Sequence, residues 1–137
     1  MSESAIDDFD SAIRRQALDE AAAETFPEAK PIVNVHAHTF FSFNYRGYSP
    51  SHFALESKRQ ALAVSGIVEF DCLDGLDEFL AAGRLLNLKT SIGLESRVYV
   101  PEFGDREINS PGEPGISYHM GIGFSSTDIP DEAQTYM

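Results

Sequence analysis

Apolar residues recur along this chain with two periods, one typical of helices and the other of buried strands. Residues 4–24 place Ile6, Phe9, Ile13 and Leu18 at broadly helical spacing, with acidic residues early and alanines late. The pattern predicts an amphipathic leading helix. Two prolines follow within the next ten residues, and they end the helix and favour an extended segment.

Predicted strands and helices then alternate. In chain order they are a strand at 31–39, a helix at about 50–64, a strand at 66–70, a helix at 76–88, and strands at 89–100 and 116–124. Ser49 as cap and Pro50 as first residue mark the start of the first of these helices. The adjacent Ile32 and Val33 predict that the first strand is buried on both faces. Such alternation predicts an α/β fold of parallel βαβ units.

Composition is that of a globular protein with one domain or part of one. The chain has 137 residues, 42% of them apolar, and ten phenylalanines supply bulky core material. We expect a leading helix at 1–28 and a metal-binding domain at 29–137. Residues 101–115 hold three prolines and three glycines and predict a long loop. A helix start at Thr127 or Asp128 near the end of the chain suggests that the domain is only the N-terminal portion of a barrel.

Charge narrows the classes of partner. Ten basic residues against 22 acidic ones give a net charge of −12, which disfavours bulk binding of nucleic acid and of anionic lipid. A bound divalent metal ion would reverse the local potential, so phosphate esters stay open as substrates. The single Cys72 has no disulfide partner, and the sequence shows neither a signal peptide nor a membrane span. We therefore expect a cytoplasmic protein.

Two of the four histidines, His36 and His38, stand one residue apart near the end of the first predicted strand. Alternate residues of a strand point to the same side, so both imidazoles would project together. Imidazole pairs bind zinc, iron or manganese. The alternative is a pair of polar loop histidines without a metal.

Three further candidates lie at or just past the end of a later predicted strand: Asp71, Glu95 and His119. In a parallel sheet these strand ends meet at one face, so we expect the three to join the histidine pair, with Glu95 bridging two ions. An acid between apolar segments is costly without a partner, although Glu95 has an alternative partner in Arg97. Asp71 is equally compatible with a turn. His52 is expected to be a solvated or packing residue.

These residues resemble the polymerase and histidinol phosphatase (PHP) family of metal-dependent phosphoesterases. The resemblance covers residues 32–124 and rests on five features: HAHT with a following serine at 36–42, SP at 49–50, LDG at 73–75, GLE at 93–95, and the later strand that carries His119. It implies a distorted (β/α)7 barrel in which a metal-activated water attacks phosphorus. It also implies His36, His38, Glu95 and His119 as metal ligands, with Glu95 and Asp71 as candidate catalytic carboxylates.

The chain departs from the family pattern at the third metal. The resemblance calls for a histidine where Phe70 stands and for a polar residue where Phe43 or Asn44 stands. We therefore expect two ions, zinc, manganese or iron, rather than three. The remaining ligands of the family have no counterpart here and would lie beyond Met137. Arg46 or Arg97 is the candidate clamp for the substrate phosphate.

The leading hypothesis is a two-metal phosphoesterase that acts on a small phosphorylated metabolite or a nucleotide. A PHP-like structural or interaction module without catalysis is the first alternative. A hydrolase of the amidohydrolase type is the second, but that superfamily does not call for a glutamate at position 95. The sequence leaves the substrate, the metal and the oligomeric state open.

Overall fold

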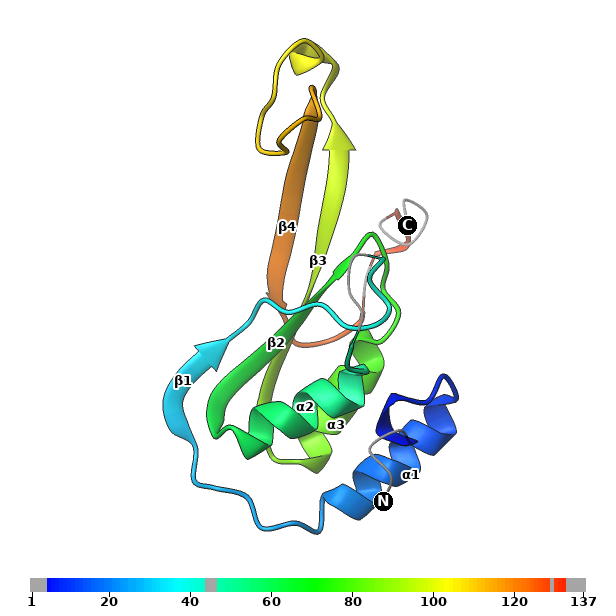
Figure 1. Cartoon of the computed structure of the whole chain (residues 1–137), viewed down its shortest axis with the longest axis vertical. Helices are drawn as coiled ribbons and strands as arrows, with labels where there is room; N and C mark the ends of the chain where they lie inside the picture. The colour runs from blue at the N-terminus through cyan, green and yellow to red at the C-terminus, as the bar shows by residue number, and fades with distance from the viewer. Residues whose placement is uncertain (1–4, 44–46, 129, 133–137) are drawn as a thin grey trace.

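The computed structural model describes residues 5–43, 47–128 and 130–132, which form a mixed α/β fold. Its sheet has four strands and is curled into a half barrel, with helices on one face (Figure 1). The regular elements of the described residues are η1 (Ala5–Asp7), α1 (Ser11–Ala21), β1 (Lys30–Asn34), α2 (Pro50–Arg59), β2 (Leu62–Phe70), α3 (Leu76–Leu85), β3 (Lys89–Tyr99), η2 (Pro101–Phe103) and β4 (Ile116–Phe124).

Parallel pairing of β1 with β2 and of β2 with β3 confirms the predicted βαβ units, and the strand order is β1-β2-β3-β4. The fourth strand has its predicted bounds but runs antiparallel to β3, so the expectation of a further parallel strand is wrong. The connection explains the difference. Residues 101–115 are long enough for a parallel return, but they contain only the short 3-10 helix η2, whereas such a crossover usually contains an α-helix.

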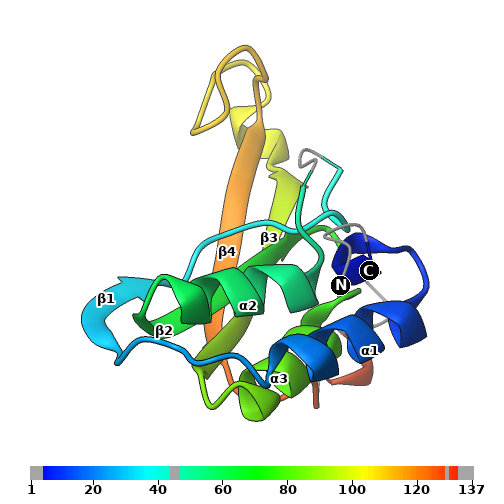
Figure 2. The ribbon, with the colours of Figure 1, turned by 60° about the horizontal axis from the view of Figure 1, so that its bottom comes forward.

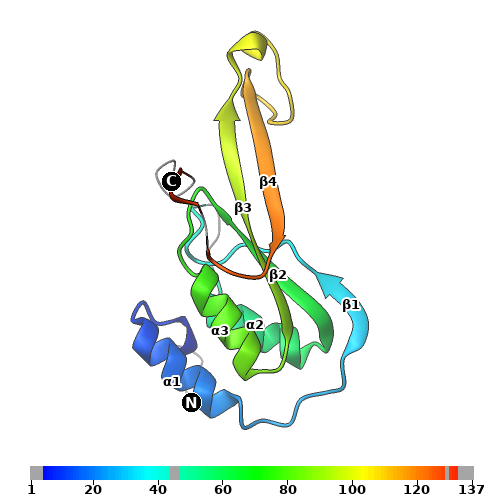
Figure 3. The same cartoon turned by 180° about the vertical axis from the view of Figure 1, so that it is seen from behind.

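The core lies between the sheet and the two helices α2 and α3, which cover the same face (Figures 2 and 3). Phe79 of α3, Leu55 of α2 and Ile67 of β2 are fully buried in this core. α2 begins as predicted, because the Ser49 hydroxyl accepts a hydrogen bond from the backbone N–H of His52 at 3.0 Å. It ends at Arg59, several residues before the predicted end, because Ala61 has a positive φ of 62°.

The predicted leading helix is divided into η1 and α1. Asp8 and Asp10 cause the break, since their carboxylates accept hydrogen bonds from the backbone N–H groups of Asp10 and Ala12, each at 2.8 Å. Phe9 falls in this break and is 91% exposed, so it is not part of the apolar face as predicted. α1 lies outside α2 and α3, and its buried Arg14 forms an ion pair with Glu78 of α3.

β1 differs from its prediction in length and burial. It ends at Asn34, and all five of its residues are exposed, because it lies at the edge of the described sheet while α2 and α3 pack on β2 and β3. At the other edge, β3 and β4 extend beyond the helices as a two-stranded hairpin (Figures 1 and 3). Within the described part of the chain, no helix has the length and apolar character needed to cross a membrane.

Candidate metal centre

The loop after β1 carries both histidines of the HAHT motif. His36 and His38 thus lie beyond the strand that was predicted to hold them. The loop nevertheless stays paired with β2, because the backbone N–H of Val68 donates to the Ala37 carbonyl at 2.8 Å. A close backbone approach permits this path. A Cβ added to Gly66 of β2 would lie 2.9 Å from the Cα of Val35, so glycine is required where the loop crosses β2.

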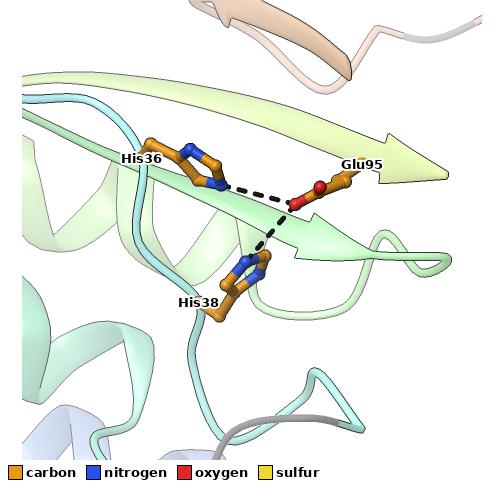
Figure 4. A group of neighbouring side chains, drawn as sticks. All are labelled: His36, His38 and Glu95. Carbon is orange, nitrogen blue, oxygen red and sulfur yellow. Dashed lines mark hydrogen bonds and ion pairs between the residues drawn. The ribbon is translucent and has the colours of Figure 1, made fainter. Parts of the chain in front are cut away.

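Both imidazoles point at one carboxylate oxygen of Glu95, which projects from β3 (Figure 4). The Nε2 atoms of His36 and His38 lie 3.3 and 3.4 Å from Oε2 of Glu95. Among the residues that the structure describes, these three form the one group of three or more histidine, cysteine or acidic side chains close enough to share an ion. Glu95 is 13% exposed and His38 19%, whereas His36 is about half exposed at 47%.

The donor set fits a divalent transition metal. Two ligand atoms that bind one zinc ion at about 2.1 Å in tetrahedral geometry are about 3.4 Å apart, which matches both distances to Oε2 of Glu95. Two imidazole nitrogens with one carboxylate oxygen also suit manganese and iron. Three protein ligands leave one tetrahedral position for water or substrate. The group could therefore hold a metal ion and leave one position open.

Buried Glu69 of β2 was missed by the sequence reasoning, yet it anchors the histidine loop. Its carboxylate is fully buried and accepts hydrogen bonds from the Thr39 hydroxyl and from the Ser42 hydroxyl, the latter at 2.6 Å. The sequence contains a signal for it, because Glu69 is an acid inside an apolar strand, and a buried acid is costly without a partner, as at Glu95.

An aromatic wall of Phe43, Phe70 and Tyr118 lies beside His38. The Phe70 ring meets the rings of Phe43 and Tyr118 edge to face, at centroid distances of 4.9 and 5.5 Å, and lies 6.0 Å from the His38 ring. Phe70 is only 6% exposed. The two positions that depart from the PHP pattern, 43 and 70, thus form one apolar contact next to the histidines. Asn44, the alternative to Phe43, lies outside the described residues.

The structure does not bring His119 to the histidine pair. It lies on β4 directly opposite Ser96, and directly opposed residues of an antiparallel pair point to the same face. Ser96 follows Glu95 on β3, so its side chain and that of His119 project from the face opposite to Glu95. The expected convergence fails because it required β4 to be parallel.

Asp71 also lies apart from the site. It follows β2 with a positive φ of 53° and accepts a hydrogen bond from the Ser96 hydroxyl at 2.6 Å. This contact places its carboxylate on the His119 side of β3. A cleft of about 820 Å³ opens on that side, lined by Leu76, Ile92, Ser96 and His119 among others. Neither Asp71 nor His119 belongs to the metal-ligand group.

Arg97, one of the two candidate phosphate clamps, is paired with an acidic residue. Arg97 lies two residues after Glu95 on the same face of β3, but its guanidinium forms an ion pair with Glu113 from the loop at 101–115. Arg46 lies outside the described residues.

Two other residues have structural partners. The Nδ1 atom of His52 lies 2.7 Å from the Asp7 carboxylate, and the His52 ring packs against Tyr48. Burial, followed by the negative charge of Glu69, raises the pKa of the Cys72 thiol to about 11, as expected for an unreactive cysteine.

No family model, curated protein or solved structure matches this chain.

Proposed function

We propose that the chain is a metal-dependent phosphoesterase that holds one divalent ion between His36, His38 and Glu95. The observation that carries the proposal is the convergence of two imidazole Nε2 atoms on one oxygen of Glu95, at distances that suit a shared ion. Three protein ligands and one open position are typical of catalytic zinc sites, whereas structural sites have four protein ligands.

A divalent ion bound there would lower the pKa of a bound water and neutralise charge on a phosphoryl oxygen. The chain's own residues orient the ligands and restrict access from one side. The aromatic wall, with Phe70 nearly buried next to His38, contains no histidine, cysteine or carboxylate. The resemblance to PHP phosphoesterases favours a small phosphorylated metabolite or a nucleotide as substrate. In a chain with a net charge of −12, a bound cation would reverse the local potential and attract such an anion.

We propose one ion per chain where the sequence suggested two. A second ion next to Glu95 needs further ligands, and His119, the residue expected to supply one, projects from the other face of β3. Asp71 is engaged by Ser96 on that same other face. The described residues therefore support a mononuclear centre.

The test combines metal content with turnover. After loading with zinc, manganese or iron and desalting, the parent chain is assayed with an aryl phosphate monoester, an aryl phosphodiester and a nucleotide. We expect metal-dependent hydrolysis of at least one ester. Glu95→Gln should abolish both hydrolysis and metal retention, whereas Glu102→Gln, the same change at an exposed position of η2, should alter neither. Hydrolysis that survives in Glu95→Gln would contradict the proposal.

A second candidate function, a metal-binding module without catalysis, is favoured by the state of Arg97. Its guanidinium is already paired with Glu113, so a phosphate would have to displace that carboxylate. The same experiment separates the two functions. One equivalent of metal in a folded parent chain that hydrolyses none of the esters would favour the module.

A further inference from the structure

Ser42 stands between the buried Glu69 and the imidazole of His38. Its hydroxyl oxygen lies 2.6 Å from Oε2 of Glu69 and 3.5 Å from Nδ1 of His38, and it accepts the backbone N–H of Phe70 at 2.9 Å. Ser42 is 2% exposed and Glu69 is fully buried, so water does not compete for these contacts. Neither Ser42 nor Glu69 has a place in the chemistry proposed above.

The hydroxyl has one hydrogen to donate, and the distances decide where it goes. Glu69 is the much closer acceptor, at 2.6 Å against 3.5 Å for Nδ1 of His38. Glu69 lies among hydrogen-bond donors, since the Thr39 hydroxyl and the Thr39 backbone N–H also point at it. A buried carboxylate without these donors would be costly. The Ser42 hydrogen is therefore committed to Glu69.

Donation to Glu69 leaves the remaining lone pair of the Ser42 oxygen for His38. A serine oxygen has two acceptor sites, and the Phe70 N–H occupies one. An acceptor at Nδ1 selects the tautomer with hydrogen on Nδ1, and its Nε2 then carries a free lone pair. Nε2 is the atom that faces Glu95 and the proposed ion. Histidine ligands of metals characteristically donate their other N–H to an oxygen acceptor, most often a carboxylate, a backbone carbonyl or water.

We propose that Ser42, oriented by Glu69, is a positioning residue that holds His38 with hydrogen on Nδ1 and presents its Nε2 lone pair to the ion. This inference rests on the proposed metal centre. Glu69 therefore has an orienting role. It fixes the direction of the serine hydroxyl from the far side, and its contacts to Thr39 fix the backbone between the two partners.

Zinc affinity of three serine variants tests the role, measured by competition with a chelating dye. Ser42→Ala should bind zinc about 10- to 100-fold more weakly with unchanged stoichiometry, as is typical for loss of such an outer partner. Ser42→Thr retains the hydroxyl and should bind close to the parent. Ser96→Ala removes a hydroxyl from the opposite face of β3 and is the matched control, with parental affinity expected.

A nitrogen-15 NMR spectrum of the zinc-loaded chain provides a readout that general destabilisation would not move. The parent and Ser42→Thr should show a slowly exchanging Nδ1–H of His38, and Ser42→Ala should lose it. Equal zinc affinity in the parent and Ser42→Ala would overturn the positioning role and leave the proposed function standing.

If the parent binds no zinc, the proposed function fails, and the hydrogen bond is then read in metal-free Glu95→Ala. That variant lacks the carboxylate that competes for a hydrogen on Nε2 of His38. Hydrogen on Nδ1 would support the Ser42 contact, and hydrogen on Nε2 would overturn it.

Discussion

Arg14→Met is the substitution with the clearest expected cost to stability. Arg14 is 3% exposed, and its guanidinium binds both oxygens of the Glu78 carboxylate as well as the backbone carbonyls of Asp8 and Phe9. Methionine preserves much of the apolar stem but leaves Glu78 without its cation. Removal of one partner of a buried ion pair costs about 3–5 kcal/mol.

The lower end of that range applies here. Glu78 is 19% exposed and keeps the hydrogen bonds from the Ser51 N–H and hydroxyl, so we expect a loss of about 3 kcal/mol. Urea unfolding followed by circular dichroism measures it. With a slope of about 2 kcal/mol per molar urea, the midpoint should fall by about 1.5 M.

Arg59→Met is the matched control. Arg59 binds Glu24 and Glu56 at the surface, where it is 36% exposed, and such pairs contribute about 1 kcal/mol or less. If Arg14→Met costs no more than this control, the buried ion pair between Arg14 and Glu78 contributes little to stability, and the reasoning is refuted.

Three further outcomes are expected. Because the pKa of Cys72 is raised to about 11, its alkylation at pH 8 should be about a hundredfold slower than that of a free thiol. The alkylation rate should still rise about tenfold per pH unit up to pH 10, and a plateau near pH 9 would contradict the raised pKa. Gly66→Ala should push the backbone at Val35 away from β2 and weaken zinc binding, and unchanged affinity in a folded variant would refute the close approach. The hydrogen bond from Arg59 lowers the pKa of Glu24 from its ordinary 4.5, so this pair should stabilise the chain above that pH and lose its effect as the pH falls below it. A stability difference between parent and Arg59→Met that persists in strong acid would argue against this pH dependence.

Local patterns in the sequence predicted the elements well where one short-range cause dominates. Ser49 and Pro50 located the start of α2, and the apolar run before Phe124 located β4 with its observed bounds. The sequence did not determine strand direction, because the same apolar alternation suits a parallel and an antiparallel neighbour. The placement of His119 depended on that direction and failed with it.

The candidate site was predictable only in part for a similar reason. The spacing of His36 and His38 and the isolated acid Glu95 identified the three residues that converge. The support for His38 involves Glu69, which is 31 positions later in the chain, and no local pattern links the two residues. Such contacts are set by the register of β2 against the loop, which becomes visible only in three dimensions.

Titration with cobalt(II), followed by absorption spectroscopy, tests the central claim most directly. Cobalt replaces zinc and reports coordination number through its visible spectrum. We predict one equivalent per chain with a four-coordinate spectrum in the parent and in Glu102→Gln, and loss of that spectrum in Glu95→Gln. A folded parent chain that binds no cobalt, or a spectrum that persists in Glu95→Gln, would contradict the metal centre formed by His36, His38 and Glu95.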